Sequence, residues 1–130
     1  MKAGVVQKDG RILIARRRQD DSLPGKWEFP GGGLEAGENH HQCLIRELRE
    51  ELEIDVRVGE LIGTSYHRHV KGEIVLHTYH VDWVGGDIAL HEHDAYEWVT
   101  AEQLGLFDLA PGDILVGRAL RGEPVPEFET

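Results

Sequence analysis

Cysteine is almost absent from this chain, since Cys43 is the only one among 130 residues. An intrachain disulfide is therefore excluded, and folding must rest on a buried apolar core. No apolar run approaches the roughly 20 residues that span a bilayer, and residues 1–20 lack a continuous apolar signal core. We therefore expect a cytoplasmic protein that makes no contact with a membrane.

Positive charge is also scarce. The chain has 14 Lys and Arg residues against 24 Asp and Glu residues, and its formal net charge is −10. Proteins that bind duplex nucleic acid neutralise phosphates with basic side chains, so this composition argues against that class of partner. A small phosphorylated ligand stays compatible, because a divalent cation can bridge an acidic protein and an anionic substrate.

Turn signals divide the chain into short strands and a few helices, and the length suits one domain. Asp9-Gly10 predicts a β-hairpin, Gly85-Gly86 predicts another turn, and Lys71-Gly72 joins two strands. The expected strands cover residues 2–7, 11–16, 54–62, 74–84 and 96–99, and the expected helices begin near residues 39, 100 and 111. Because β-helix-β alternations are few, this order predicts an α/β fold with a mixed or largely antiparallel sheet. We expect one domain over 1–122 and a loosely ordered tail over 123–130.

The predicted helix over residues 39–52 has clear local signals. Asn39 is a good N-cap, and Gln42 three residues later completes the pattern of a capping box. An apolar stripe predicts the buried face of this helix, and it consists of Leu44, Ile45, Leu48 and Leu52.

Three carboxylates share another face of this helix. Positions three and four residues apart lie side by side, so Glu47, Glu50 and Glu51 point the same way. Their mutual repulsion would be relieved by an oxygen-seeking divalent cation such as Mg²⁺ or Mn²⁺. The alternative is a solvated acidic face that is neutralised by Arg46 and Arg49 within the helix.

The glycine-rich segment before the helix favours the cation. Its spacing is Gly32, five residues, Glu38, seven residues, Arg46-Glu47-Leu48, one residue, and then Glu50-Glu51. This pattern resembles the Nudix box, in which every fixed position but one is matched here. Glu53 stands where the family has glycine. A glycine just after a helix often adopts a left-handed conformation, which costs another residue about 1 kcal/mol or more.

The resemblance implies an α/β/α sandwich around a central mixed sheet and hydrolysis of a nucleoside diphosphate linked to another group, by water attack on phosphorus. It implies that Mg²⁺, with Mn²⁺ as a substitute, is bound by Glu47, Glu50 and Glu51 and by the carbonyl of Gly31. Glu38 and Arg46 would be orienting partners of these box residues. The metal would neutralise phosphate charge and activate water.

Outside the box, the likeness extends to pyrimidine-preferring relatives of MutT, and it covers about residues 2–120. It rests on the segments 27–32, 90–93, 97–98 and 109–114. The relatives imply a triphosphate substrate, either (d)CTP-like or a modified or oxidised dNTP, cleaved to monophosphate and pyrophosphate.

Four further residues gain roles from the same resemblance. Glu92 corresponds to a loop carboxylate that acts as general base or extra metal ligand, although a plain surface acid is an equal reading. Arg18 is a candidate phosphate contact, with Arg16 and Arg17 as rivals, and Phe29 is a candidate substrate contact. Asp113 would accept a hydrogen bond from the amino group of cytosine, or it would merely cap the helix at residue 111.

Two alternatives remain at this stage. One is another Nudix substrate class, such as ADP-ribose or a dinucleoside polyphosphate. Relatives that cleave ADP-ribose often carry a proline some way beyond the box, and none lies between Pro30 and Pro111. The other alternative is a non-catalytic domain that senses a nucleotide, although such domains usually lose box glutamates that are all present here. Since the family includes both monomers and homodimers, the oligomeric state is left open.

Overall fold

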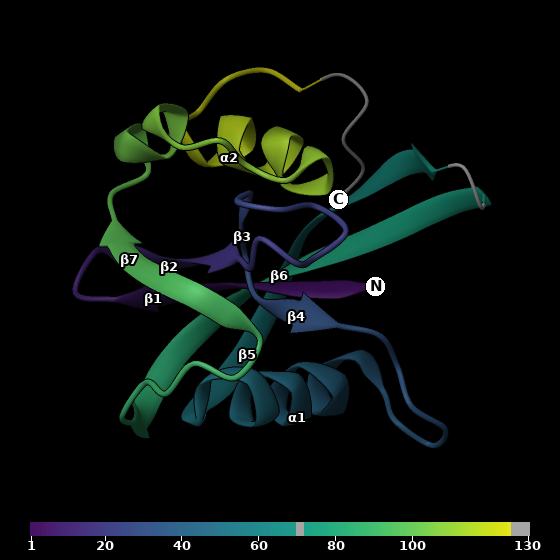
Figure 1. The fold of residues 1–130 in the computed structure, drawn as a ribbon, viewed down its shortest axis with the longest axis vertical. Helices are drawn as coiled ribbons and strands as arrows, with labels where there is room; N and C mark the ends of the chain where they lie inside the picture. Colours follow the sequence, from purple (N-terminus) through teal and green to yellow (C-terminus); the bar gives the residue numbers. More distant parts are fainter. Residues whose placement is uncertain (70–71, 126–130) are drawn as a thin grey trace.

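A computed structural model describes residues 1–69 and 72–125 and shows a sheet between two helices (Figure 1). Helix α1 (His40–Leu52) covers one face of the sheet and α2 (Ile114–Leu120) covers the other. The strands are β1 (Lys2–Lys8), β2 (Arg11–Arg17), β3 (Trp27–Glu28), β4 (Gly31–Gly32), β5 (Ile54–His69), β6 (Gly72–Gly86) and β7 (His93–Val99). Short 3₁₀ helices, η1 (Glu102–Leu106) and η2 (Pro111–Asp113), precede α2. The predicted α/β/α sandwich is confirmed.

The sheet is mixed, as the sequence predicted. Its main order is β3-β2-β1-β6-β5, while β4 pairs with β1 and β7 pairs with β2. Only the β1–β6 pair is parallel among these described pairs. The β1–β2 hairpin turns at Asp9 and Gly10, whose φ angles of 52° and 76° are both positive. That geometry explains the Asp-Gly dipeptide, because two positive φ angles match the twist of a tight hairpin.

Two apolar clusters pack against the two faces of the sheet. The cluster beneath α1 consists of Val6, Leu13, Leu44, Leu48, Leu52, Ile54 and Val81. The cluster on the opposite face consists of Ala3, Val5, Ile12, Ile14, Phe29, Val99, Leu104 and Val116. The central strands β1 and β2 therefore contribute residues to both clusters, as the alternation of side chains along a strand requires.

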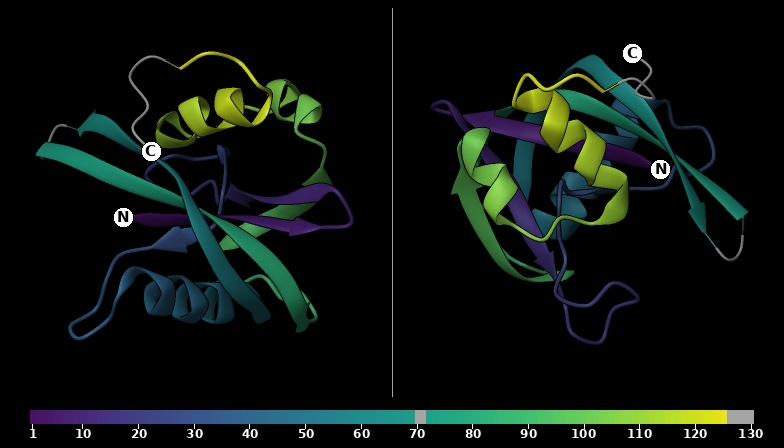
Figure 2. Two further views of the ribbon diagram at one scale, coloured as in Figure 1. Left: turned by 180° about the vertical axis from the view of Figure 1, so that it is seen from behind. Right: turned by 90° about the horizontal axis from the view of Figure 1, so that it is seen from above.

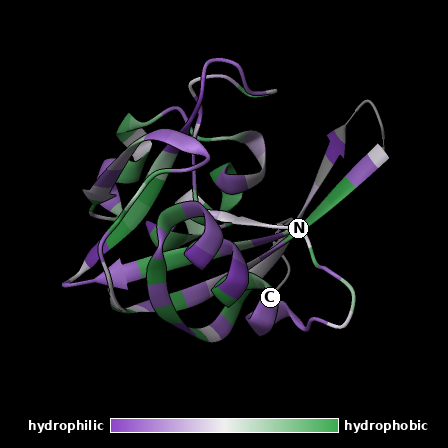
Figure 3. Ribbon diagram, turned by 60° about the horizontal axis from the view of Figure 1, so that its bottom comes forward, coloured by the Kyte–Doolittle hydropathy of each residue, from purple (hydrophilic) through white to green (hydrophobic). Residues whose placement is uncertain are grey.

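Helix α1 begins as predicted but buries a slightly different face. The Asn39 side chain accepts a hydrogen bond from the Gln42 backbone amide, and the Gln42 side chain accepts one from the Asn39 backbone amide. The prediction that Ile45 is buried was wrong, because Ile45 is 37% exposed and Cys43 is fully buried instead. The buried face of α1 is centred on Leu44 and Leu48. The sheet covers the side of the helix that carries Cys43, whereas the side that carries Ile45 is left in water. Figure 3 shows the mixture of hydrophilic and hydrophobic residues along this helix.

Strands β5 and β6 are longer than the sequence predicted. Gly85 and Gly86 were expected to form a turn, but they end β6 and pair with Asp55 and Ile54. A Cβ atom on Gly86 would lie 2.6 Å from the carbonyl oxygen of Glu53, so close backbone approach explains this glycine. The two strands form a long ribbon that extends past the rest of the sheet (Figure 2).

Part of two further predictions falls outside the described residues. These are Lys71 in the predicted connection between the strands, and residues 126–130 of the predicted tail. Across residues 1–69 and 72–125, no helix combines the length and apolar character needed to cross a membrane.

Candidate active site

A cavity of about 320 Å³ opens beside the glycine-rich strand β4. Five carboxylates line it, and these are Asp21, Glu28, Glu51, Glu92 and Asp113. Apolar groups complete its wall, among them Leu23, Phe29, Ile74, Leu76 and Pro111. The cavity therefore combines an acidic side with an apolar side, a combination that suits a nucleotide bound with its charge neutralised.

The glycines of β4 let this strand approach its neighbours closely. A Cβ atom on Gly31 would lie 1.9 Å from the carbonyl oxygen of Lys2 in β1. A Cβ atom on Gly32 would lie 2.4 Å from the carboxylate carbon of Glu47. Any larger residue would push the strand away from both partners, so these two glycines place the Glu47 carboxylate against backbone.

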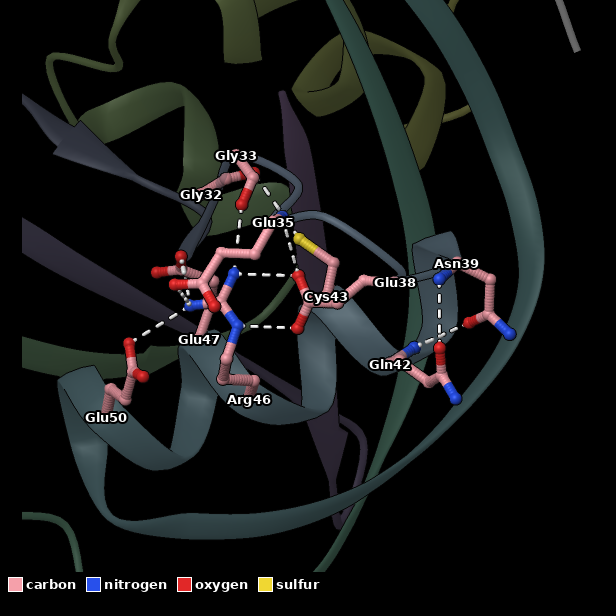
Figure 4. A network of polar contacts seen from close by, with 10 residues as sticks. All are labelled: Gly32, Gly33, Glu35, Glu38, Asn39, Gln42, Cys43, Arg46, Glu47 and Glu50. Carbon is pink, nitrogen blue, oxygen red and sulfur yellow. Dashed lines mark hydrogen bonds and ion pairs between the residues drawn. The ribbon is translucent and has the colours of Figure 1, made fainter.

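Arg46 organises the remaining box carboxylates (Figure 4). Its guanidinium donates two hydrogen bonds to Glu38, at 2.6 and 2.9 Å, and one to the Gly33 carbonyl at 3.0 Å. It also donates to Glu47 at 2.9 Å and to Glu50 at 3.1 Å. The Arg46 guanidinium lowers the pKa of Glu38, which stays ionised. Arg46 thus ties the loop before α1 to the carboxylate face of the helix.

Glu51 differs from the other box glutamates because it lines the cavity and is largely buried. Its Oε2 atom is buried without a hydrogen-bond partner. Burial, followed by repulsion from Glu47, Glu28 and Glu92, raises the pKa of Glu51 to about 9. A buried carboxylate that has one unpartnered oxygen and lies beside other carboxylates is a position that a divalent cation would stabilise, so the residues present fit such an ion.

The box glutamates are therefore divided between two environments. Glu51 lines the cavity, whereas Glu47 and Glu50 bind Arg46 and are not among the residues that line it. Within the described ranges, no three His, Cys, Asp or Glu side chains are gathered so that they could hold a metal ion. Gly31, whose backbone carbonyl is a predicted metal ligand, lines the cavity together with Glu51.

Sequence reasoning missed Glu28, which lies at the centre of the polar side. Glu28 accepts hydrogen bonds from Arg17 at 2.8 Å and binds the Nε2 atom of the buried His93 at 2.8 Å. Its position between two aromatic residues, before the glycines, was the only available signal. Such a position does not distinguish a cavity carboxylate from an ordinary strand residue.

The three neighbouring arginines are also separated by the fold. Arg17 lines the cavity and pairs with Asp21 and Glu28. Arg18, the candidate chosen from the sequence, does not line the cavity, and its guanidinium lies 3.5 Å from the carbonyl oxygen of His91. Arg16 pairs with Asp94. The phosphate role of Arg18 stays a prediction, and Arg17 is the arginine of this group that faces the cavity.

Asp113 contacts Phe29 at the wall of the cavity and does not take up the helix-capping role that was one of its two predicted roles. The buried Asp113 carboxylate accepts a hydrogen bond from the Phe29 amide at 3.2 Å. Burial is the main cause that raises the pKa of Asp113 well above its usual range, and the negative charge of the nearby Glu28 raises it further. Asp113 makes no capping hydrogen bond to α2. Its side chain is therefore available to the cavity, as a base contact requires.

Comparisons with known proteins agree with this geometry. Residues 2–120 match the family model of the NUDIX domain. The chain is 43% identical over 113 residues to the CTP pyrophosphohydrolase of Escherichia coli, which covers 86% of this chain and 83% of that protein. It is 44% identical over 73 residues to the 8-oxo-dGTP diphosphatase of Proteus vulgaris, covering 52% of this chain and 65% of that protein. The solution structure of the E. coli ORF135 protein has a TM-score of 0.83 at 38% identity, covering 93% of this chain and 86% of that one.

Proposed function

The chain belongs to the Nudix family of pyrophosphohydrolases, and from that premise we propose that it hydrolyses a nucleoside triphosphate to the monophosphate and pyrophosphate. The proposed substrate is (d)CTP or a similar modified or oxidised dNTP. One observation carries the proposal. The same cavity is lined by Glu51, whose Oε2 atom is buried without a partner, and by a buried carboxylate, Asp113, beside apolar walls. A charged phosphate chain and an apolar base ring require those two surroundings.

Glu47, Glu50 and Glu51, together with the Gly31 carbonyl, would hold Mg²⁺. The bound ion would neutralise phosphate charge and lower the pKa of the attacking water. Glu28 adds negative charge beside Glu51, which strengthens the attraction of this side of the cavity for a cation. Arg46 and Glu38 would act on Glu47 and Glu50 as orienting partners, since Arg46 contacts all three carboxylates.

The chain's own side chains would then divide the remaining work. Glu92 would accept the proton of the attacking water, or serve as an additional cation ligand. Arg17 would donate hydrogen bonds to phosphate oxygens, because it lines the cavity with its charge already oriented by Asp21 and Glu28. Such positioning and charge stabilisation is most of what a protein contributes to phosphoryl transfer.

The Asp113 carboxylate would select the base. Cytosine presents an amino group that can donate to a carboxylate, whereas uracil presents a carbonyl at the corresponding position. Phe29 and Leu76 would cover the ring. Identity to the relatives named for CTP and for 8-oxo-dGTP, 43% and 44%, exceeds the 30% identity to a relative named ADP-ribose pyrophosphatase, and this difference favours a nucleoside triphosphate.

A hydrolysis panel tests this proposal. Common NTPs and dNTPs, 5-methyl-dCTP, 8-oxo-dGTP, ADP-ribose and a dinucleoside tetraphosphate are incubated with the protein and Mg²⁺, and products are separated by chromatography. We expect monophosphate plus pyrophosphate, formed fastest from cytidine nucleotides. Turnover of only ADP-ribose or the dinucleotide would overturn the substrate class. Saturable nucleotide binding without turnover would instead favour the sensor alternative.

Binding of the cation is measured separately by thermal melting in EDTA and in Mg²⁺. We expect Mg²⁺ to raise the melting temperature of the wild-type protein, because it binds the folded state alone. The Glu51→Gln variant removes a proposed ligand and should show a much smaller increase. Equal increases in both proteins would exclude Glu51 as a ligand.

A further inference from the structure

The C-terminus of α1 carries a residue that is unfavourable for its backbone conformation. Glu53 ends the helix with φ 57° and ψ 35°, the left-handed conformation that glycine adopts easily. Its amide donates to the carbonyls of Arg49 and Leu48, so the backbone alone would be satisfied by glycine. What glycine could not supply is the side chain.

The Glu53 side chain contacts a loop that comes from a distant part of the chain. Its Oε2 atom accepts a hydrogen bond from the Nε2 atom of His91 at 2.5 Å. Two backbone bonds join the same parts, since the Ala89 amide donates to the Leu52 carbonyl at 3.0 Å and the His91 amide donates to the Glu51 carbonyl at 3.2 Å. Loop residues 89–91 thus satisfy carbonyls at the end of α1 that no later helical turn can reach.

This contact lies directly beside the acidic side of the cavity. Glu92 follows His91 and lines the cavity with Glu51. Glu92 is exposed and comes from a loop far from Glu51 in the sequence. The position of its carboxylate at the cavity therefore depends on how the neighbouring loop residues are held.

We propose that Glu53 and His91 form a side-chain clasp that holds Glu92 beside Glu51, and that Glu53 is a positioning residue of this enzyme. This inference rests on the proposed function, in which Glu92 acts on the attacking water or on the cation. The Arg18 guanidinium donates a hydrogen bond of 3.5 Å to the His91 carbonyl and so contacts the same loop. Arg18 therefore contributes to the position of the loop even though it does not line the cavity.

Stability and activity are expected to change in opposite directions when the clasp is removed. In Glu53→Gly, relief of the left-handed strain outweighs the loss of an exposed ion pair, so the melting temperature should rise by about 4 °C. At the same time kcat should fall by about 10-fold, because misplacement of a reacting group is costly even when it is small. KM should stay within about twofold, since Glu92 acts in the chemical step and not in substrate binding.

Three matched variants separate positioning from general damage. Glu53→Gln keeps an oxygen that can accept from His91 and should retain most of the wild-type kcat. His91→Ala should reproduce the 10-fold loss, and the double variant Glu53→Gly with His91→Ala should lose no more than either single variant.

Asp55→Asn is the control, because it breaks the exposed Arg49–Asp55 pair of 2.6 Å near the same helix end without touching the loop. It should leave kcat unchanged.

A second measurement tests the clasp without measuring enzyme activity. Amide hydrogen exchange of residues 89–92 should be at least several-fold faster in Glu53→Gly than in the wild-type protein, and unchanged in Asp55→Asn. If the wild-type protein hydrolyses no nucleotide, the proposed function fails, and unchanged exchange in Glu53→Gly would then also overturn the clasp. In an active enzyme, wild-type kcat in Glu53→Gly, or losses that add in the double variant, would overturn the positioning role.

Discussion

The Glu51 carboxylate is unfavourable for the folded protein by itself, since it is buried beside Glu47, Glu28 and Glu92. Residues of this kind are typical of functional sites, where charge is arranged for a ligand and not for stability. Glu38 is the opposite case, because its charge is fully compensated by Arg46 and its pKa is lowered. The two glutamates belong to the same motif and have different physical roles.

Replacement of Glu51 by glutamine should therefore weaken catalysis and strengthen the fold. We expect Glu51→Gln to lower kcat by about 100-fold or more, because a proposed cation ligand is lost. The melting temperature in EDTA near pH 7 should rise, because burial forces Glu51 to take up a proton well above its ordinary pKa, whereas glutamine is neutral and keeps the shape. Glu50→Gln should lower kcat similarly. Steady-state kinetics and thermal melting measure both effects, with the exposed Glu60→Gln variant as control. Wild-type turnover in Glu51→Gln would contradict the assignment.

Asp113 should determine the ranking among bases more than the rate of the chemical step. In Asp113→Asn the amide oxygen can still accept from the Phe29 amide, while its NH₂ group would oppose the amino group of cytosine and favour the carbonyl of uracil. We expect the ratio of kcat/KM for CTP over UTP to fall by about 10-fold. Asp113→Ala should also change the ranking but with lower thermal stability, because the buried Phe29 amide loses its acceptor. An unaltered ranking in both variants would remove Asp113 from the base site.

Helix α1 serves two functions on two faces. Its carboxylate face belongs to the candidate site, and its apolar face anchors the helix to the sheet through Leu44, Leu48 and Leu52. The capping box at Asn39 and the backbone bonds from loop 89–91 satisfy its two ends. The position of the carboxylates therefore depends on packing at residues that never approach the substrate.

The apolar face should account for most of the helix's contribution to stability. Leu48 is fully buried beneath the helix, so Leu48→Ala should lower the free energy of unfolding by about 2–5 kcal/mol. Ile45 is 37% exposed, and Ile45→Ala should cost about 1 kcal/mol or less. Urea denaturation of the two variants measures the contrast. Comparable losses would show that Ile45 is packed after all.

A histidine pair at the start of α1 links the helix to the sheet. His40 Nδ1 lies 2.6 Å from the hydroxyl of Tyr79, and His77 Nδ1 lies 3.0 Å from the hydroxyl of Thr64. The two imidazole centroids are 5.0 Å apart. Burial, followed by the positive charge of Lys2, lowers the pKa of both histidines. The N-terminal amine also opposes protonation of both histidines, His41 opposes that of His40, and His40 opposes that of His77.

At the scale of the whole molecule, these lowered pKa values predict a loss of stability in mild acid. The unfolded chain binds protons at these histidines near pH 6.5, whereas the folded protein resists them until a lower pH. The stabilisation that comes from keeping these two histidines neutral is fully present above about pH 7.5, and it declines as the pH falls toward 5. The melting temperature of His40→Gln should therefore fall less between pH 7.5 and pH 5 than that of the wild-type protein. Parallel curves for the two proteins would assign the acid sensitivity to other groups.

The net charge of −10 also acts on the whole molecule. A strongly acidic protein repels a free triphosphate at long range, so association with substrate should depend on charge neutralisation near the cavity. Arg17 and Lys2 supply positive charge at the cavity, and the proposed cation would add to it. The overall acidity and the acidic cavity thus fit a substrate that arrives with its own divalent cation.

Features that depend on a few neighbouring residues were determined by the sequence alone. The Asp9-Gly10 hairpin and the Asn39 capping box both form as predicted, because each rests on local dihedral angles and hydrogen bonds. The Nudix family and the α/β/α sandwich also followed from the sequence, since the spacing of the box is carried by one continuous segment.

Features that depend on which distant segment covers a residue were decided only by the tertiary structure. The exposure of Ile45, and the placement of Arg17 and not Arg18 at the cavity, follow from the faces that the sheet and the loops cover. The isolation of Glu51 and its repulsion from Glu28 and Glu92 likewise need segments far apart in the sequence. A local pattern shows which side chains share a face, but only packing decides which face meets water, another carboxylate or a cavity.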